Sequence, residues 1–168
     1  MDRGLSVSSS RTSHSLAEAG SVALVSAATL DLVRRLVTAD HGLAILATAR
    51  GDGTVHASLV NAGVLDDPVT KEPAVGLVAS GNAHKLTLLR RSGQATIVLR
   101  AGWEWVSVEG AVRLIGPEDP AGADLPQLLR DIFVAAGGTH DDWAEFDRVM
   151  AAERRTAVLV DPQRITSN

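Results

Sequence analysis

Lys85 lies in the stretch of this sequence whose residue types could bind an anion. The stretch runs from Val75 to Gly93 and contains an apolar strand, a Ser-Gly-Asn break and a short amphipathic helix. Asn82 is expected to cap that helix, so His84 and Lys85 fall in its first turn, where the helix dipole disfavours a cation. An ammonium beside the free backbone N–H groups of a helix start is typical of a phosphate site. The other reading of Lys85 is a solvated side chain, although the chain has only two lysines against fourteen arginines.

No side chain is predicted to act as a nucleophile or as a catalytic acid or base. The sequence shows neither a Ser-His-Asp order nor a carboxylate pair, and His56 is the one histidine expected on a strand. A strand histidine is more often a packing or hydrogen-bonding residue than a proton donor. The chain has no cysteine and its five histidines show no ligand spacing, so no metal site is predicted. A bound cofactor that carries the chemistry would explain this pattern.

The size and composition of the chain predict one soluble globular domain. Its 168 residues are 45% hydrophobic, which is enough to form one buried core. Residues 1–20 hold six serines and few large apolar side chains, so they are predicted to be a disordered arm before a domain at 21–168. The net charge of −4, with acids and bases interspersed, argues against nucleic acid as a partner. No apolar run near the N-terminus is long enough to span a membrane, and the expected location is the cytoplasm.

The helix that carries Lys85 is expected to lie among antiparallel strands. Asp52-Gly53 is a strong hairpin signal between two apolar segments. Strands are predicted at Leu43–Ala49, Thr54–Leu65, Ala74–Ala79, Gln94–Arg100, Trp103–Ile115 and Thr156–Asp161, where Pro162 ends the last one. Helices are predicted at Ser26–Ala39, Leu125–Ala136 and Asp141–Glu153. Charged residues that suit helix ends are interpreted as structural, namely Asp141, Asp142 and Glu145 in a first turn and Arg90 and Arg91 in a last turn.

The long fifth strand is predicted to have two different faces, because successive side chains alternate. Four residues form an apolar core face, namely Val106, Val108, Val112 and Leu114. The opposite face carries Trp103, Trp105, Ser107 and Glu109. Such an amphipathic face is typical of a ligand wall or a subunit interface, and it predicts a homodimer. The alternative is that both indoles pack beneath the neighbouring helices.

Six mainly antiparallel strands in this order predict a small closed barrel, because an open sheet would leave its edges uncovered. At this point the chain resembles the pyridoxamine 5′-phosphate oxidase-like split β-barrel flavoproteins, and within them the F-420-dependent (deazaflavin) reductases. The resemblance covers roughly residues 32–119 and is carried by L-A-T-A-R-G-D-G-T-V-H-A-S-L-V, A-H-K-L-T-L-L-R-R and V-S-V-E-G-A-V. It implies a mainly β fold, a six-stranded antiparallel split β-barrel of the FMN-binding type with α-helices.

The resemblance also implies which residues hold a cofactor. Family members bind the cofactor phosphate at the start of the short helix, which corresponds here to Ala83, His84 and Lys85, with Asn82 at the cap. They line the ring with the second and third strands, and the matching residues are His56, Ser58, Val60, Ala79 and Ser80. Because family dimers bury the cofactor between protomers, Trp103 and Trp105 would contribute from the interface.

The function that the resemblance implies is hydride transfer. The chain would be an oxidoreductase that binds coenzyme F-420 (a deazaflavin), or alternatively FMN, and transfers a hydride to or from a small organic substrate. The alternative from another class is a split-barrel protein that carries a flavin or haem without turnover.

Overall fold

The structure, a computed structural model, describes residues 30–119 and 122–168. The predicted arm at 1–20 and residues 26–29 of the predicted first helix lie outside these ranges. The remainder of that helix is present at 30–39, and its buried Val33, Leu36 and Val37 pack into the main core. Within the described residues, no helix combines the length and the apolar character that a membrane crossing needs.

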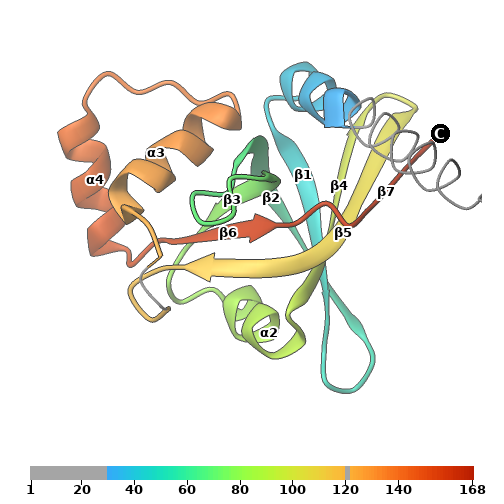
Figure 1. Ribbon diagram of the computed structural model, residues 1–168, viewed down its shortest axis with the longest axis horizontal. Helices are drawn as coiled ribbons and strands as arrows, with labels where there is room; N and C mark the ends of the chain where they lie inside the picture. Colours follow the sequence, from blue (N-terminus) through green and yellow to red (C-terminus); the bar gives the residue numbers. More distant parts are fainter. Residues whose placement is uncertain (1–29, 120–121) are drawn as a thin grey trace, which may run out of the picture.

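Six strands form a closed antiparallel barrel, which confirms the predicted fold class (Figure 1). They are β1 (Leu43–Ala49), β2 (Val55–Asp66), β3 (Pro73–Ala79), β4 (Gln94–Ala101), β5 (Glu104–Ile115) and β6 (Thr156–Val160). The order around the barrel is β4-β1-β2-β3-β6-β5, and β5 pairs back onto β4. The tight turn between β1 and β2 contains the predicted Asp52-Gly53 pair, where Gly53 has a φ of 84°. Closure matters because it leaves few unpaired strand edges.

A seventh strand, β7 (Arg164–Ser167), was missed by the sequence analysis. It pairs with the first half of β5, from Val106 to Glu109, while β6 pairs with the second half. The chain passes from one half to the other over Gly110, where a Cβ would overlap the carbonyl oxygen of Asp161. Strand β6 thus ends before Pro162, as predicted, but the chain pairs with β5 again after this proline. Four residues of mixed polarity give too weak an alternation for this strand to be predicted.

Besides the helix at 30–39, the described residues form three helices: α2 (His84–Ser92), α3 (Leu125–Ala135) and α4 (Trp143–Ala152). Helix α2 follows β3 at one end of the barrel, whereas α3 and α4 lie together on one side (Figure 1). Asp142 caps α4 by accepting a hydrogen bond from the Glu145 backbone at 3.0 Å. Glu145 in turn pairs with Arg148. The interpretation of these first-turn carboxylates as structural is confirmed for both residues.

The protein has two apolar cores. One lies inside the barrel, and the other lies outside part of the barrel wall. The main core fills the interior and includes Leu46, Leu77, Ile97, Val108 and Val158. The second core lies between the helices and the outer surface of β3, β5, β6 and the second half of β2, and includes Ala74, Ile115, Leu129, Ile132, Phe146, Ala157 and Leu159. Strand β6 is consequently buried at all five positions. Strands covered on both faces read as continuous apolar runs, which explains the T-A-V-L-V sequence.

The outer surface of the other half of the barrel is not covered by a described element. Four large apolar side chains of β1 and β2 are exposed there, and we call them the open sheet face: Leu43 (38%), Ile45 (47%), Val55 (62%) and Leu59 (68%). Ile45 lies between Leu59 of β2 and Val98 of β4 in the strand register. A contiguous apolar patch of this kind is typical of a protein interface.

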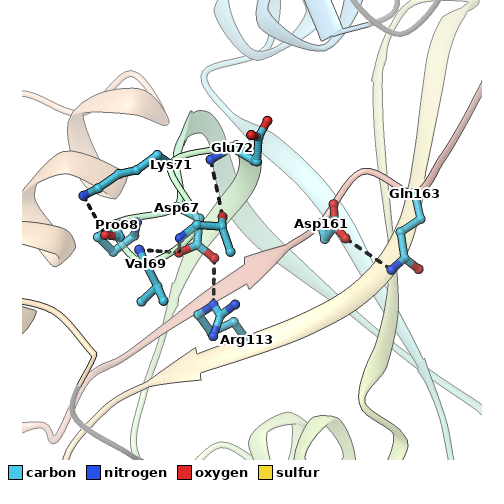
Figure 2. A network of polar contacts seen from close by, with 9 residues as sticks. Asp67, Pro68, Val69, Lys71, Glu72, Arg113, Asp161 and Gln163 are labelled. Carbon is cyan, nitrogen blue, oxygen red and sulfur yellow. Dashed lines mark hydrogen bonds and ion pairs between the residues drawn. The ribbon is translucent and has the colours of Figure 1, made fainter. Parts of the chain in front are cut away.

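The loop between β2 and β3 is held by a buried carboxylate, Asp67 (Figure 2). Its oxygens accept hydrogen bonds from the Val69 and Thr70 amides at 2.7 and 3.2 Å and from Arg113 Nε at 2.7 Å. Burial opposes ionisation of Asp67, but these hydrogen bonds outweigh it and hold its pKa below the usual value. Asp67 thus fastens the loop to β5 as a carboxylate.

Replacing Asp67 with asparagine is expected to lower the free energy of unfolding at pH 7 by about 1 to 3 kcal/mol, because Arg113 loses its charged partner. A depressed folded-state pKa means that the wild-type contribution is present above the unfolded value of about 3.9 and is lost as the pH falls through the folded-state pKa. Urea unfolding of both proteins at pH 7 and pH 3 measures this. A difference that stays constant between the two pH values contradicts the assignment.

Candidate functional site

Helix α2 begins without a side-chain cap. The capping residue is Ala83, no side chain accepts a hydrogen bond there, and the first turn contains no acidic residue. The predicted cap, Asn82, is wrong: its side chain is exposed and lies one residue before the cap position. The tight turn Ser80–Ala83, closed by a bond from the Ala83 amide to the Ser80 carbonyl at 2.9 Å, shifts the helix start by one residue. The amides of this helix end therefore remain available to an anion.

Lys85 is the second residue of α2 and is half-buried. Burial lowers the pKa of its ammonium. Among the described residues, no carboxylate lies within ion-pair distance of Lys85 Nζ, in contrast to Arg90 at the other end of the same helix. A partly desolvated cation at the positive end of a helix dipole is unfavourable unless an anion joins it.

Three further basic side chains meet at this helix end. The rings of His56 and His84 contact each other edge to face, with 5.8 Å between their centroids. Arg50 approaches His56 as well, with 3.2 Å between Nη2 and Nδ1. Since a guanidinium can only donate, Nδ1 of His56 accepts and its proton resides on Nε2. We call Arg50, His56, His84 and Lys85 the basic cluster.

Arg50 is the member of this cluster that the sequence analysis missed. It precedes the Gly51-Asp52-Gly53 turn, which folds it back along β2, and its Nη1 donates to the Val55 carbonyl at 2.6 Å. Its neighbour Asp52 does not pair with it, because the Asp52 carboxylate accepts hydrogen bonds from Thr54. A basic residue before a hairpin turn is a weak sequence signal for an anion site. Only the turn geometry shows where the guanidinium points.

Ser58 places an unsatisfied hydroxyl on the same side of β2 as His56. The Oγ atom is buried and has no hydrogen-bond partner among the described residues. Buried hydroxyl groups are normally paired, so an unpaired one calls for a physical cause such as an absent ligand atom. Its position, two residues along the strand from His56, is where the sequence analysis expected a cofactor ring.

Two other residues expected to line the ring belong to the main core. Val60 and Ala79 are 8% and 2% exposed and pack inside the barrel. Their side chains shape the wall behind His56 and Ser58, and they offer little surface of their own. Ser80 is half-buried in the turn before α2. The structure therefore brings together the predicted residues His56, His84 and Lys85.

Trp103 and Trp105 lie far from the basic cluster within one chain. Trp103 is not in the predicted strand: it lies in the turn between β4 and β5, and β5 begins at Glu104. That turn is at the opposite end of β4 from α2, which immediately precedes this strand (Figure 1). Trp103 is 94% exposed, so the alternative that it packs under helices is wrong, whereas Trp105 is half-buried. Trp103 can approach a site near α2 only if that site belongs to another copy of the chain.

The far end of α2 has a structural role, as predicted for Arg90. Arg90 donates from Nε and Nη2 to the two oxygens of Asp119, both at 3.0 Å. The Asp119 side chain is only 7% exposed. This bidentate pair fixes α2 to the segment after β5, and the hydrogen bond from Arg90 to Asp119 raises the pKa of Arg90. Lys85 and Arg90 thus offer a matched pair of cations on one helix, one unpaired and one paired.

No protein-family model matches the chain, and no curated protein matches it significantly. Several solved structures do match it. A conserved hypothetical protein from Mycobacterium tuberculosis is 22% identical with a TM-score of 0.60, over 84% of this chain and 82% of that one. A pyridoxamine 5′-phosphate oxidase-related, FMN-binding protein from Nostoc punctiforme is 16% identical with a TM-score of 0.54, over 85% and 81%. A protein described as an F420 reductase is 14% identical with a TM-score of 0.51, over 74% and 88%. The chain therefore has the split β-barrel fold of the pyridoxamine 5′-phosphate oxidase-like proteins, as its sequence predicted.

Proposed function

We propose that this protein is an oxidoreductase that binds a phosphate-bearing deazaflavin or flavin and transfers a hydride to or from a small organic substrate. The observation that carries the proposal is the half-buried Lys85 at the uncapped start of α2, with no acidic partner among the described residues. The fold supports the proposal because proteins described as FMN-binding and as an F420 reductase share it.

The residues present fit such a cofactor. Lys85 and the first-turn amides of α2 would hold the phosphate, Arg50 would add to the positive potential, and His84 would offer a hydrogen-bonding ring beside it. The unpaired Ser58 Oγ would hydrogen bond to a polar atom of the ring, beside His56. When bound, a reduced deazaflavin or flavin supplies the hydride. The chain itself would bind and orient the cofactor and exclude water from it. We assign no side chain as the proton donor.

We further propose that the working form is a homodimer that joins through the open sheet face. Leu59 is 68% exposed and Val55 is 62% exposed, and these apolar side chains lie on the half of the barrel that α3 and α4 leave uncovered. Burying them against a second copy would remove this apolar surface from water. A second copy would also give Trp103 and Trp105 a surface to contact, next to a cofactor bound between protomers.

Titration of the purified protein with both cofactors tests the proposal. We expect F-420 to bind more tightly than FMN, because the sequence motifs resemble those of the F-420-dependent reductases. The protein should then be colourless as purified, and its affinity can be measured by fluorescence. A yellow preparation with a flavin spectrum assigns FMN in place of F-420. Binding of neither cofactor contradicts the proposal as a whole.

A carrier without turnover is the competing function. Both readings predict binding, so the discriminating measurement is oxidation of the reduced cofactor under single-turnover conditions with a panel of small unsaturated acceptors. Oxidation that depends on the protein and on an acceptor supports the enzyme. Tight binding with no oxidation by any acceptor in the panel favours the carrier.

A further inference from the structure

A hollow of about 240 Å³ lies beneath α3 and α4, outside the barrel and apart from the basic cluster. We call it the helix hollow. Its apolar lining comes from β3, α3 and α4, namely Val78, Ile132, Phe133, Ala136, Phe146 and Met150. Asn61 and Arg155 supply the polar groups. An apolar concave site with a few polar groups at its margin is the usual form of a small-molecule pocket.

The floor of the hollow is rigid and its rim is adaptable. Ile132 and Phe146 are buried at 1% and 5% exposure, whereas Phe133, Met150 and Arg155 are half-buried. Met150 and Arg155 also line a second hollow of about 160 Å³ on their other side, beneath the start of α3. Because methionine is unbranched and adapts easily, a shift of Met150 would enlarge the helix hollow at the expense of its neighbour.

Arg155 gives this pocket a preference for anions. It lies at the end of α4, just before β6, and its Nε donates to Glu153 at 2.7 Å. The Glu153 side chain is 46% exposed, so the pair is largely solvated and a ligand carboxylate could replace it at small cost. Of the residues that line either hollow, the acidic one is Asp147, and Arg130 already neutralises it. A ligand carboxylate at Arg155 therefore meets no unpaired acidic residue in the lining, and the displaced Glu153, which does not line the hollow, stays solvated.

The lining also indicates an aromatic ligand body. Both phenylalanines of the chain contribute to the helix hollow, with 5.1 Å between their ring centroids. Trp143 packs edge to face on Phe146 at 5.5 Å, so the Phe146 ring is held in a fixed orientation. Fixed ring edges and a thioether favour contact with the face of another aromatic ring.

We propose that the helix hollow binds a small aromatic carboxylate, with its ring against Phe133, Phe146 and Met150 and its carboxylate on Arg155. A volume of about 240 Å³ lies below the usual range for cofactor pockets of roughly 300 to 1,000 Å³, so a single-ring acid fits and a flavin does not. The site is independent of the proposed cofactor site, and either proposal can fail alone.

Calorimetric titration of the full-length protein with benzoate and phenylacetate, beside neutral benzyl alcohol, tests this. We expect saturable binding of one molecule of acid per chain and at least tenfold weaker binding of the alcohol. Arg155→Gln should weaken acid binding by about tenfold to a hundredfold and leave alcohol binding within twofold, because only the charge-assisted contact is lost. Arg148→Gln, on the exposed side of α4, is the matched control and should bind the acids like the wild type.

Two further variants distinguish acid binding in the helix hollow from acid binding at α2. Val78→Phe should fill the hollow and abolish binding of both acid and alcohol, and a thermal melt establishes that it folds. Lys85→Ala should leave acid binding unchanged. Acid binding that is lost in Lys85→Ala but kept in Arg155→Gln would place the anion at α2 and overturn the proposal. No saturable binding to the wild type, or equal affinity for acid and alcohol, would overturn it as well.

Discussion

Replacing Lys85 with alanine is expected to weaken binding of F-420 or FMN by about tenfold to 150-fold. The loss corresponds to one charge-assisted hydrogen bond worth about 1.5 to 3 kcal/mol. Lys85 has no acidic partner among the described residues, so the substitution removes no internal ion pair. Fluorescence titration of variant and wild type with each cofactor measures the effect.

The same substitution should leave the protein without cofactor as stable as before, or more stable by a few tenths of a kcal/mol. The ammonium is partly desolvated and stands at the positive end of the α2 dipole, and both effects oppose its charge. Stability and affinity should therefore move in opposite directions, which distinguishes a ligand-binding cation from a structural one.

Arg90→Ala is the matched control on the same helix. It leaves the Asp119 carboxylate, which is 7% exposed, without its bidentate partner, so the free energy of unfolding should fall by about 1 to 3 kcal/mol. Cofactor affinity should change less than threefold, because Arg90 lies at the far end of α2. If Lys85→Ala binds both cofactors like the wild type, the phosphate site is not at α2.

Placing glutamate at both Ile45 and Leu59 is expected to convert a dimer into a monomer. In a single chain both side chains project into solvent, at 47% and 68% exposure, so the fold should tolerate the change. In a dimer formed through the open sheet face, four added carboxylates would lie buried and close together, which is strongly unfavourable. Light scattering should give the 17.6 kDa of one chain for the variant and twice that mass for the wild type. Cofactor affinity should fall with the dimer if the cofactor is held between protomers.

Val134→Glu provides the control for this experiment. Val134 is 53% exposed on α3 and is not a residue of the open sheet face, so its replacement should leave the mass unchanged. A wild-type protein that is monomeric at micromolar concentration contradicts the interface. A double variant that stays dimeric would place the interface elsewhere.

Most of the fold could be predicted because its signals are local. Alternation along β2 and β5, the Asp52-Gly53 turn and the helical spacing of Leu128, Leu129 and Ile132 each lie within a few residues of one another. The position of Lys85 at a helix start could likewise be predicted from neighbouring residues. This prediction holds although Asn82 is not the cap, because a cap shifted by one residue still leaves Lys85 in the first turn.

Long-range pairing decided what the sequence could not show. β7 pairs with β5 because the chain crosses at Gly110, where backbone approaches backbone, and its four residues alone carry too little pattern to be recognised. Alternation predicted that Trp103 and Trp105 share one strand face, but the hairpin turn includes Trp103 and exposes it.

The candidate site also combines features that the sequence determines with features that only the tertiary structure determines. The sequence by itself determined that a lysine begins a helix after a strand, because the helix signals and the lysine are neighbours in the chain. Only the tertiary structure decided that Arg50 and His56 gather beside His84 and Lys85, since barrel closure and the β1–β2 turn bring them next to α2. It also decided which half of the barrel α3 and α4 cover, and hence which apolar side chains remain exposed. The physical reason is that residue spacing fixes local geometry, whereas contacts between distant segments depend on how the whole sheet closes.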